Sequence, residues 1–361
     1  MKKIAIIGGG IIGLTLANYL DPQKFQVTLF DEPTGQATSA SAGIISPWLS
    51  KRRNQQWYQL AKDGAAFFPK LVQDFQLDHT IYQQAGTLIL RSEEQLTELF
   101  ALAEERKKNA PEIGTIELLS GEQTQQALPL LKPLPALKIS GGGRLDGKAY
   151  LKRLRQLAMG KGVEIIPQRV QLANAQTVSY GENKIVFDQI ILTAGPHLKE
   201  LLAPLGYHVD IRPQKGQLLV FQTARKDSGK FPVAMLDGEA DLIPFLAGKI
   251  LLGATHENDA GWDLRETSAA FQQLTNGAKK FLAEPAQLLA TPFHYRVGTR
   301  AYTSDFAPFF GQLTEQLLVA SGLGSSGLTT GPYIGYLLAQ ALNTGKTDWS
   351  AYQKELSNYI H

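Results

Sequence analysis

The sequence has no cysteine in its 361 residues, and this absence excludes disulfide bonds, thiolate metal ligands and a cysteine nucleophile. Histidine is scarce, and its six copies form no HxH or HxxxH pair, so a zinc site is not expected. A large excess of either charge is also missing, because 36 Lys and Arg against 33 Asp and Glu give only +3. That is a weak electrostatic footprint for a polyanionic partner. What remains is an ordinary globular composition, with 43% hydrophobic and 19% charged residues.

Long apolar runs are absent except for one near the N-terminus, IAIIGGGIIGLTLANYL, which follows two lysines. Its length and position resemble a signal peptide. However, Gly8, Gly9 and Gly10 interrupt the run, and Asp21 and Pro22 stand where a small-residue cleavage site would be needed. β-branched residues precede the glycines and a 3.6-residue apolar period follows them, which indicates a strand, a turn and a helix. The expected location is therefore the cytoplasm.

The predicted elements fall into two groups. The first begins with a strand, a helix and a strand at Lys3–Ile7, about Ile12–Leu20 and Gln26–Asp31, which is how a doubly wound parallel sheet starts. Further elements are a strand at Thr87–Leu90, a strand pair within KIVFDQIILTAG, a strand at Leu317–Ala320, and helices at about Gln55–Asp74, Glu93–Lys108, Thr267–Leu282 and Pro332–Leu342. Between residues 213 and 292, β-rich runs at Gln217–Phe221, Leu242–Phe245 and Ile250–Ala254 indicate a second, sheet-rich part.

These two groups alternate along the chain, so we predict an α/β fold (α+β overall) made of two interleaved domains. A Rossmann-like, dinucleotide-binding domain takes residues 1–85, 141–212 and 295–361 in this prediction. A mostly antiparallel β-sheet domain takes residues 86–140 and 213–294 and covers the substrate.

A glycine motif, Gly8-x-Gly10-x-x-Gly13, lies between the first strand and the first helix. Gly8 permits the tight turn, Gly10 lets a pyrophosphate approach the backbone, and Gly13 lets helix and strand pack closely. Asp31 ends the second strand, where a carboxylate accepts hydrogen bonds from the ribose hydroxyls of an adenosine. The motif therefore predicts a bound dinucleotide, and by itself it does not separate NAD from FAD.

The segment ATSASAGIISPW, residues 37–48, resembles the D-amino-acid oxidase, glycine oxidase and sarcosine oxidase family of FAD enzymes. In that family a Ser/Thr/Ala-rich segment wraps the pyrophosphate and flavin. Further similar segments follow in the family's order: RLDGKAYLKRL, ILTAG, RPQKGQLL, LIPFLAGKILLGAT, RVGTRAYTSDFAPFFG and ASGLGSSGLTTGPYIGYLLAQAL. Gly147 departs from the pattern, because proline is usual there. The resemblance covers nearly the whole chain and implies FAD as the cofactor. Without a cysteine for a thioether link, we expect the FAD to be non-covalent.

The resemblance implies FAD contacts from the glycine turn, the end of the second strand, the segment after it, the middle of the chain and a C-terminal Gly/Ser loop. The implied residues are Gly8, Gly10, Ile11, Ile12, Gly13, Asp31, Glu32, Thr38, Ser39, Ala40, Ser41, Gly43, Ile44, Val170, Thr193, Ala194, Gly195, Gly324, Ser326, Gly327, Leu328 and Thr329. The loop at residues 322–331 would expose N–H groups beside the start of a helix. Such donors favour the anionic reduced flavin.

The resemblance also identifies Arg300 as the arginine that holds a substrate carboxylate, for which its two-pronged donor face is suited. Arg296 would lie on the same strand face. Asp241 replaces a tyrosine of glycine oxidase, and Ser325 is identified as a further residue of the kind that reaches toward the substrate carboxylate in amino-acid oxidases. His256 takes a pocket-facing position. The four substrate-site candidates are therefore Arg300, Asp241, His256 and Ser325. Together they predict a more polar pocket than one built for glycine.

The predicted reaction is oxidation of the C–N bond of a small amino acid or N-substituted glycine, by hydride transfer to flavin N5 and hydrolysis of the imine. Two alternatives stay open. The C-terminal segments also resemble the FAD domain of the bifunctional enzyme that matures wobble uridine in tRNA. That domain removes a carboxymethyl group from carboxymethylaminomethyl-uridine. A flavin-binding subunit without turnover is the alternative of another class. The electron acceptor and the oligomeric state are open as well.

Overall fold

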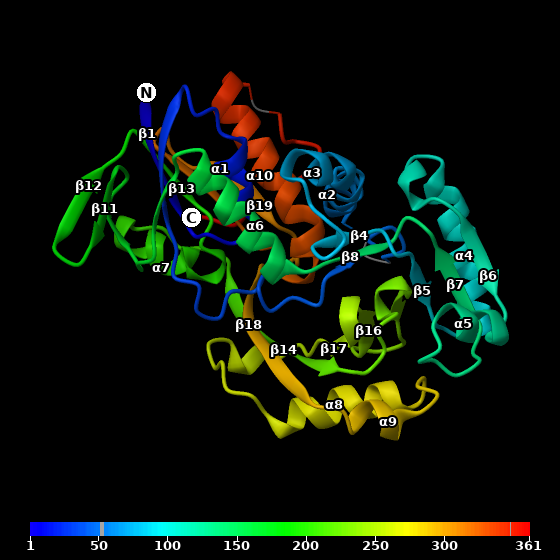
Figure 1. The fold of residues 1–361 in the computed structure, drawn as a ribbon. Coiled ribbons are helices and arrows are strands. Elements are labelled where there is room, and N and C mark those ends of the chain that lie inside the picture. The colour runs from blue at the N-terminus through cyan, green and yellow to red at the C-terminus, as the bar shows by residue number, and fades with distance from the viewer. Residues whose placement is uncertain (51–53, 347) are drawn as a thin grey trace.

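The computed structural model describes residues 1–50, 54–346 and 348–361, and its framework is a pair of large β-sheets (Figure 1). The six-stranded sheet has the order β19-β20-β13-β1-β2-β9, and all neighbours are parallel except β19 and β20. Its strands are β1 (Lys2–Ile7), β2 (Phe25–Phe30), β9 (Glu164–Ile166), β13 (Gln189–Leu192), β19 (Phe309–Gln312) and β20 (Leu317–Ser321). The Rossmann-like sheet is therefore confirmed, and three separated parts of the chain contribute to it.

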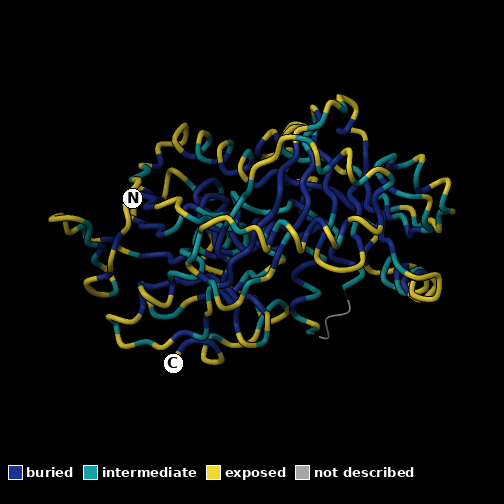
Figure 2. Tube along the Cα trace, turned by 90° about the horizontal axis from the view of Figure 1, so that it is seen from below, coloured by how far each residue is buried: buried dark blue, intermediate teal, exposed yellow. Residues whose placement is uncertain are grey.

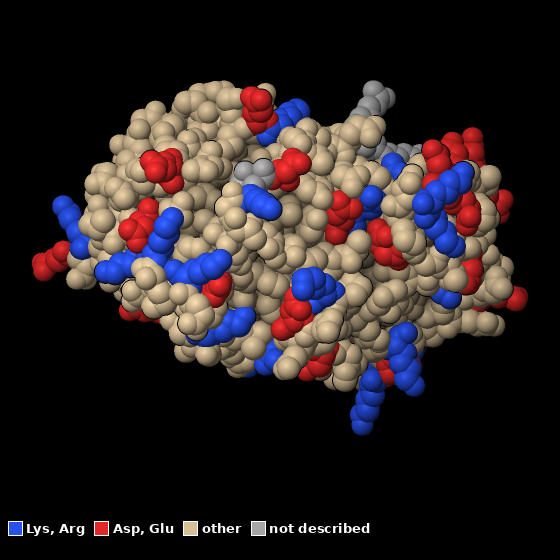
Figure 3. Space-filling model, turned by 90° about the horizontal axis from the view of Figure 1, so that it is seen from above, with Lys and Arg blue, Asp and Glu red and all other residues tan. Residues whose placement is uncertain are grey.

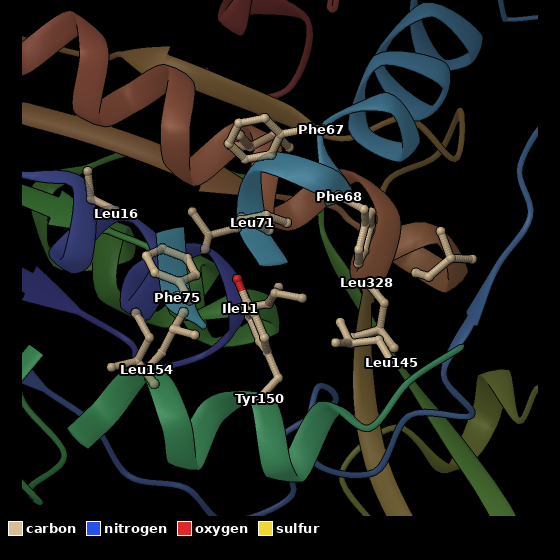
Figure 4. Packing of buried hydrophobic residues seen from close by; sticks show 14 of the residues in the cluster. Ile11, Leu16, Phe67, Phe68, Leu71, Phe75, Leu145, Tyr150, Leu154 and Leu328 are labelled. Atoms are coloured by element: carbon tan, nitrogen blue, oxygen red, sulfur yellow. The ribbon is translucent and has the colours of Figure 1, made fainter. Parts of the chain in front are cut away.

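The first helix, α1 (Ile11–Tyr19), is buried over most of its length because other helices surround it (Figure 4). These are α3 (Phe68–Phe75), α6 (Gly147–Gly160) and α10 (Gly327–Thr344). Thr15 Oγ1 of α1 lies 3.0 Å from Tyr150 Oη of α6. On the other side, a Cβ at Gly335 of α10 would lie 2.8 Å from Ile12 O, so glycine allows the close approach. This packing holds the start of α1 at the end of β1.

The eight-stranded sheet has the order β18-β14-β17-β16-β15-β5-β7-β6. Its neighbours are antiparallel except β15 and β5, so the predicted antiparallel character is confirmed. The strands are β5 (Thr87–Ile89), β6 (Ile116–Leu119), β7 (Ala136–Ile139), β14 (Arg212–Gln222), β15 (Val233–Met235), β16 (Asp241–Pro244), β17 (Lys249–Gly253) and β18 (Phe293–Tyr302).

Alternation along β14 gives this sheet two different apolar faces. Leu219 and Phe221 belong to a cluster with α8 (Ser268–Lys279) and α9 (Pro285–Leu289), which cover the outer face (Figure 1). Leu218 and Val220 point the other way and pack near Ala42 and the segment after it. The inner face of the eight-stranded sheet therefore turns toward the part of the chain that carries the six-stranded sheet.

The remaining elements connect or cover these sheets, and Figure 2 shows the buried residues concentrated in the interior strands and the exposed ones at peripheral helices and turns. They are β3 (Ile44–Ile45), β4 (Tyr82–Gln83) and β8 (Gly143–Leu145) in one small sheet, β10 (Gln171–Asn174), β11 (Thr177–Tyr180) and β12 (Asn183–Val186) in another, and the helices α2 (Gln55–Ala66), α4 (Glu93–Lys107), α5 (Gly121–Ala127) and α7 (Leu198–Leu202). Within the described ranges, no helix is both long and apolar enough to cross a membrane.

Three local predictions need correction. The helix predicted at Gln55–Asp74 is two helices, α2 and α3, because Pro69 begins a new helix after a break at Phe67. The two strands of KIVFDQIILTAG are β12 and β13, which lie in different sheets and do not pair. The C-terminal helix begins at Gly327 rather than at Pro332, which lies inside it. The local sequence marks Pro332 as a helix start, but tertiary packing extends the helix through it.

The predicted domain boundary at residue 295 falls inside β18. This strand is paired with β14 from Phe293 to Tyr302, so the sheet continues eight residues beyond the predicted end of the sheet-rich domain at residue 294. The division into two interleaved domains stays a prediction, with this strand counted in the sheet-rich part.

Candidate cofactor and substrate site

A cavity of about 610 Å³ lies between the carboxyl ends of the parallel strands and the inner face of the eight-stranded sheet. Strands β1, β2, β13 and β20 end beside it, and the residues that follow them, Gly8, Asp31, Thr193 and Gly322, line it. Gly216 of β14 lines the opposite side. The carboxyl edge is where open parallel sheets bind their ligands.

The glycine turn after β1 shapes one wall of the cavity. Gly8 has φ +107°, and a Cβ there would lie 2.5 Å from the carbonyl oxygen of Thr193. A Cβ at Gly13 would lie 2.0 Å from the carbonyl oxygen of Gly8, so helix and strand pack directly against each other. By contrast, a Cβ at Gly10 would meet only Thr38 Oγ1, at 3.8 Å. Gly8 and Gly13 are thus needed by the protein itself, whereas Gly10 leaves room for a ligand.

Two helices begin at the cavity with their amino ends available. Helix α1 starts after Gly10, and helix α10 starts after Ser326. Neither helix has an acidic residue in its first turn, and neither has a side-chain cap. Their first N–H groups and positive helix ends therefore suit the anionic parts of a ligand.

Asp31 is only 4% exposed at the end of β2, and the protein fixes its carboxylate from three sides. Oδ1 accepts from Gly9 N at 2.8 Å and from Gln36 Nε2 at 3.4 Å. Oδ2 pairs with Arg155 Nη2 at 2.5 Å. A carboxylate has about four acceptor positions, so this arrangement orients Asp31 and leaves capacity for a ligand hydroxyl.

Arg300 lies on β18 and extends over Gly216 of β14. A Cβ at Gly216 would lie 2.7 Å from the guanidinium, so only glycine permits this position. Arg300 Nη1 donates to Gln214 Oε1 at 3.1 Å and to Thr255 O at 2.9 Å, both neutral acceptors. Burial lowers the pKa of Arg300, although Glu239 and Glu257 act in the opposite direction. No ion pair of Arg300 is found among the described residues, so it is a largely enclosed cation beside a cavity.

Asp241, at the start of β16, is an enclosed carboxyl group on the same cavity. Its Oδ1 accepts from Leu236 N at 3.0 Å, and burial raises its pKa to about 7. Glu239 is better compensated, because His256 Nδ1 lies 3.1 Å from its Oε1 and Gln273 Nε2 donates to its Oε2 at 2.6 Å. The cavity therefore has a cationic side at Arg300 and an acidic side at Asp241.

The raised pKa of Asp241 predicts a pH-dependent stability difference. In the unfolded chain the carboxyl ionises near pH 4, whereas in the folded protein it stays neutral until about pH 7. The folded state therefore loses stability between these pH values, and Asp241→Asn avoids the loss. We expect the free energy of unfolding of the variant to match that of wild type near pH 4 and to exceed it by roughly 1–4 kcal/mol at pH 8. Chemical denaturation of the ligand-free protein at both pH values measures this difference. An equal difference at both pH values would contradict this.

Comparison with known proteins decides the family. The model of the FAD dependent oxidoreductase family (DAO) matches residues 3–341. The chain belongs to this family. The uncharacterized oxidoreductase YurR of Bacillus subtilis (strain 168) is 36% identical, with 96% of each chain covered. Glycine oxidase of Pseudomonas putida (strain KT2440) is 26% identical, with 92% of each covered. The crystal structure of iminodiacetate oxidase (IdaA) from Chelativorans sp. BNC1 superimposes with a TM-score of 0.90 at 28% identity, over 99% of this chain and 98% of that one.

This FAD-dependent oxidoreductase offers groups that fit its cofactor. We infer that the open space at Gly10 and the start of α1 face the pyrophosphate, because they combine room for a ligand with the positive end of the helix, where Ile11 N already donates to Thr38 Oγ1 at 3.3 Å. Asp31 would hold the adenosine ribose. The Gly/Ser loop before α10 would then lie beside the flavin.

Most residues predicted to contact FAD line the cavity: Gly8, Gly10, Ile11, Ile12, Asp31, Glu32, Thr38, Ala40, Ser41, Gly43, Ile44, Val170, Thr193, Ala194, Gly195, Gly324, Gly327 and Leu328. Gly13, Ser39, Ser326 and Thr329 do not. Gly13 lies behind the turn, Ser39 Oγ donates to Gln36 Oε1, Ser326 Oγ accepts from Trp57 Nε1, and Thr329 is only 4% exposed. These four stay predictions as FAD contacts.

The four predicted substrate residues, Arg300, Asp241, His256 and Ser325, all line the same cavity. Arg296 does not, although it is on the same strand. Its Nη2 lies 3.5 Å from Asp146 Oδ2, so it belongs to an ion pair behind the cavity.

Sequence reasoning missed several residues at the site. Arg155 comes from α6, 124 residues after the aspartate that it pairs with, and no local motif marks it. Arg169, His197 and Trp262 line the cavity from three different segments, and the His197 and Trp262 rings stack with centroids 4.2 Å apart. Only Glu239 carried a usable signal, because it stands two residues before Asp241 and would share its side of an extended strand.

Replacing Asp31 tests the ribose assignment. Asp31→Ala should weaken FAD retention by about 1–3 kcal/mol, because a charge-assisted acceptor is lost. Retention is measured as the ratio of flavin to protein absorbance after gel filtration at several dilutions. A variant that keeps its flavin like wild type would show that Asp31 serves only to hold Gly9 and Arg155.

Proposed function

We propose that the enzyme oxidises the C–N bond of a small amino acid or N-substituted glycine whose carboxylate is held by Arg300. The observation that carries this proposal is the environment of Arg300. Its guanidinium is enclosed beside the cavity and is held by neutral oxygens only. An enclosed cation is costly unless it is paired, so an anionic ligand group is favoured there.

The geometry also supports a positioning role for this arginine. Gln214 and Thr255 fix one nitrogen of the guanidinium, and contact with Gly216 fixes its plane. A bound carboxylate would then be held in one orientation, which fixes the carbon between carboxylate and amine. When bound, FAD supplies the acceptor for the two electrons and the hydrogen that leave this carbon. The similar glycine oxidase and iminodiacetate oxidase are named for substrates of this class.

An anaerobic screen tests the proposal. Purified enzyme with its FAD is mixed with glycine, sarcosine, D- and L-amino acids and N-alkylglycines, and loss of the oxidised flavin absorbance is followed. Amines without a carboxylate, matched in size, serve as controls. We expect bleaching by at least one carboxylate-bearing amine and little by its control. Equal bleaching by both would remove Arg300 from the proposal.

The tRNA-directed alternative stays a prediction. On the face shown in Figure 3, Lys and Arg are interspersed with Asp and Glu, and no continuous basic track is visible. Together with the net charge of +3, this gives little support for a polyanionic substrate. Bleaching by a carboxymethylaminomethyl-uridine in tRNA, with free amino acids inert, would favour this alternative.

A further inference from the structure

Arg300 and Asp241 lie on the same face of the eight-stranded sheet, toward opposite sides of the cavity. The register pairs Arg300 with Gln214, two residues from Gly216 on β14. It pairs Leu218 with Gly253, and Gly253 in turn with Asp241. Side chains two residues apart on a strand share a face, so these positions form one surface.

The surface between the two charges carries Gly216, Leu218 and Gly253. Gly216 and Gly253 both line the cavity and carry no side chain that could fill it, whereas the Leu218 side chain is buried near Ala42 and is not part of the lining. The Arg300 guanidinium lies over Gly216, next to this segment of β14. The cavity is therefore open over both glycines, and Asp241 lies beyond Gly253.

Asp241 makes no ion pair among the described residues, although the charge of Arg91 acts to lower its pKa. Arg91 donates from Nη1 to the carbonyl oxygens of Leu90 and Met235, and its Nε lies 3.8 Å from Asp237. Among the described residues, the Asp241 carboxyl accepts a hydrogen bond from Leu236 N through Oδ1. Its raised pKa shows that the protein compensates this carboxylate poorly. A cation arriving through the cavity would supply what is missing.

The distance between the two sites indicates whether Asp241 would pair with the amine that is oxidised or with a further cationic group of the substrate. Two strand spacings of about 4.8 Å and two residues of about 3.4 Å separate the backbones at Gly216 and Asp241 by about 12 Å. Two ion-pair contacts of about 4 Å each between group centres leave about 4 Å between the ligand's charges. The carbon of a carboxylate and its α-nitrogen are only about 2.5 Å apart. A charge two to three bonds beyond the amine nitrogen lies about 5–6 Å from the carboxylate carbon in an extended chain and about 4 Å in a bent one, so it fits this gap better than the amine itself.

We propose that Asp241 is a specificity-determining residue that pairs with a cationic group on the substrate's amine substituent, two to three bonds beyond the nitrogen that is oxidised. This inference rests on the proposed function, because it takes Arg300 as the carboxylate site. The preferred substrate class is then an N-substituted glycine with a cationic arm. A second carboxylate, as in iminodiacetate, is disfavoured beside Asp241.

Three matched ligands test this assignment on the enzyme with its FAD. N-(2-aminoethyl)glycine carries the cation, N-propylglycine is its neutral analogue, and iminodiacetate carries an anion instead. Dissociation constants come from anaerobic calorimetric titration, and flavin bleaching is recorded in parallel. We expect N-(2-aminoethyl)glycine to bind at least tenfold tighter than N-propylglycine, and iminodiacetate to bind weakest.

Asp241→Asn keeps the size of the side chain and removes its charge. It should bring the first two ligands within about twofold of each other and leave N-propylglycine unchanged. Asp237→Asn is the control, because Asp237 is in the same hairpin, its side chain is 60% exposed, and it lies outside the cavity lining. It should keep the wild-type preference.

The outcomes separate this inference from the proposed function. If N-propylglycine bleaches the flavin but the cationic analogue binds no tighter, or if Asp241→Asn weakens both equally, Asp241 is not the subsite and the proposed function stands. A preference for iminodiacetate in wild type would also overturn the assignment. If none of the ligands binds and no carboxylate-bearing amine bleaches the flavin, both proposals fall.

Discussion

Arg300→Ala should lower kcat/KM for flavin reduction by carboxylate-bearing amines by about 2–4 kcal/mol in transition-state terms, and Arg300→Lys should fall between alanine and wild type. Lysine keeps the charge but cannot present two parallel N–H donors. It also cannot reproduce both the anchoring to Gln214 and Thr255 and a contact with the ligand. Rapid anaerobic mixing, with the flavin absorbance as the signal, measures the effect.

The control for this series is Arg265→Ala, because the Arg265 side chain is 86% exposed and pairs with Asp263 at the surface. It removes the same charge from the protein and should leave flavin reduction unchanged. FAD content should be the same in all variants. Equal losses on carboxylate-bearing and carboxylate-free amines would mean that Arg300 supports the fold rather than the substrate.

Gly13→Ala and Gly10→Ala should fail in different ways although they are three residues apart. At Gly13 the new methyl group would lie 2.0 Å from Gly8 O and 2.6 Å from Thr193 Oγ1, so the helix must move away from the strand. We expect the free energy of unfolding to fall by about 1–3 kcal/mol or more even without FAD, and the protein to lose its flavin.

Gly10→Ala should keep the stability of the FAD-free protein. Gly10 has an extended backbone that alanine adopts readily, and the nearest atom to its Cβ is 3.8 Å away. The methyl group would instead occupy the space assigned to the pyrophosphate, so flavin retention should fall. Thermal unfolding of FAD-free protein and the flavin-to-protein absorbance ratio separate the two effects. Normal flavin retention in Gly10→Ala would place the pyrophosphate elsewhere.

Features set by neighbouring residues were predictable from the sequence. The strand, turn and helix at residues 2–19 follow from the β-branched run, the three glycines and the 3.6-residue apolar period. The location of Asp31 was predictable because a residue directly after a parallel strand lies at the carboxyl edge of the sheet. The family resemblance added Arg300, Asp241, His256 and Ser325, which the fold brings to one cavity.

What the sequence could not determine depends on contacts between distant segments. The helix start at Gly327 is set by packing, since local propensities differ by only about 1 kcal/mol per residue between ordinary side chains. Likewise, Arg155 reaches Asp31 only because α6 packs beside α1. The break at Phe67, by contrast, follows from the nearby Pro69, a local signal that the predicted single helix did not take into account.

The sequence by itself thus determined the nucleotide-binding turn and the alternation of the two sheets, because short-range periodicity and motif spacing encode them, whereas FAD as the cofactor came from the family resemblance. The tertiary structure alone decided that Arg300 lies over Gly216, that Asp241 pairs with Gly253 on the same cavity, and that Arg296 makes an ion pair with Asp146. Those relations come from strand register. Register is fixed by the pairing of β14, β16, β17 and β18 across long stretches of chain, which no local pattern specifies.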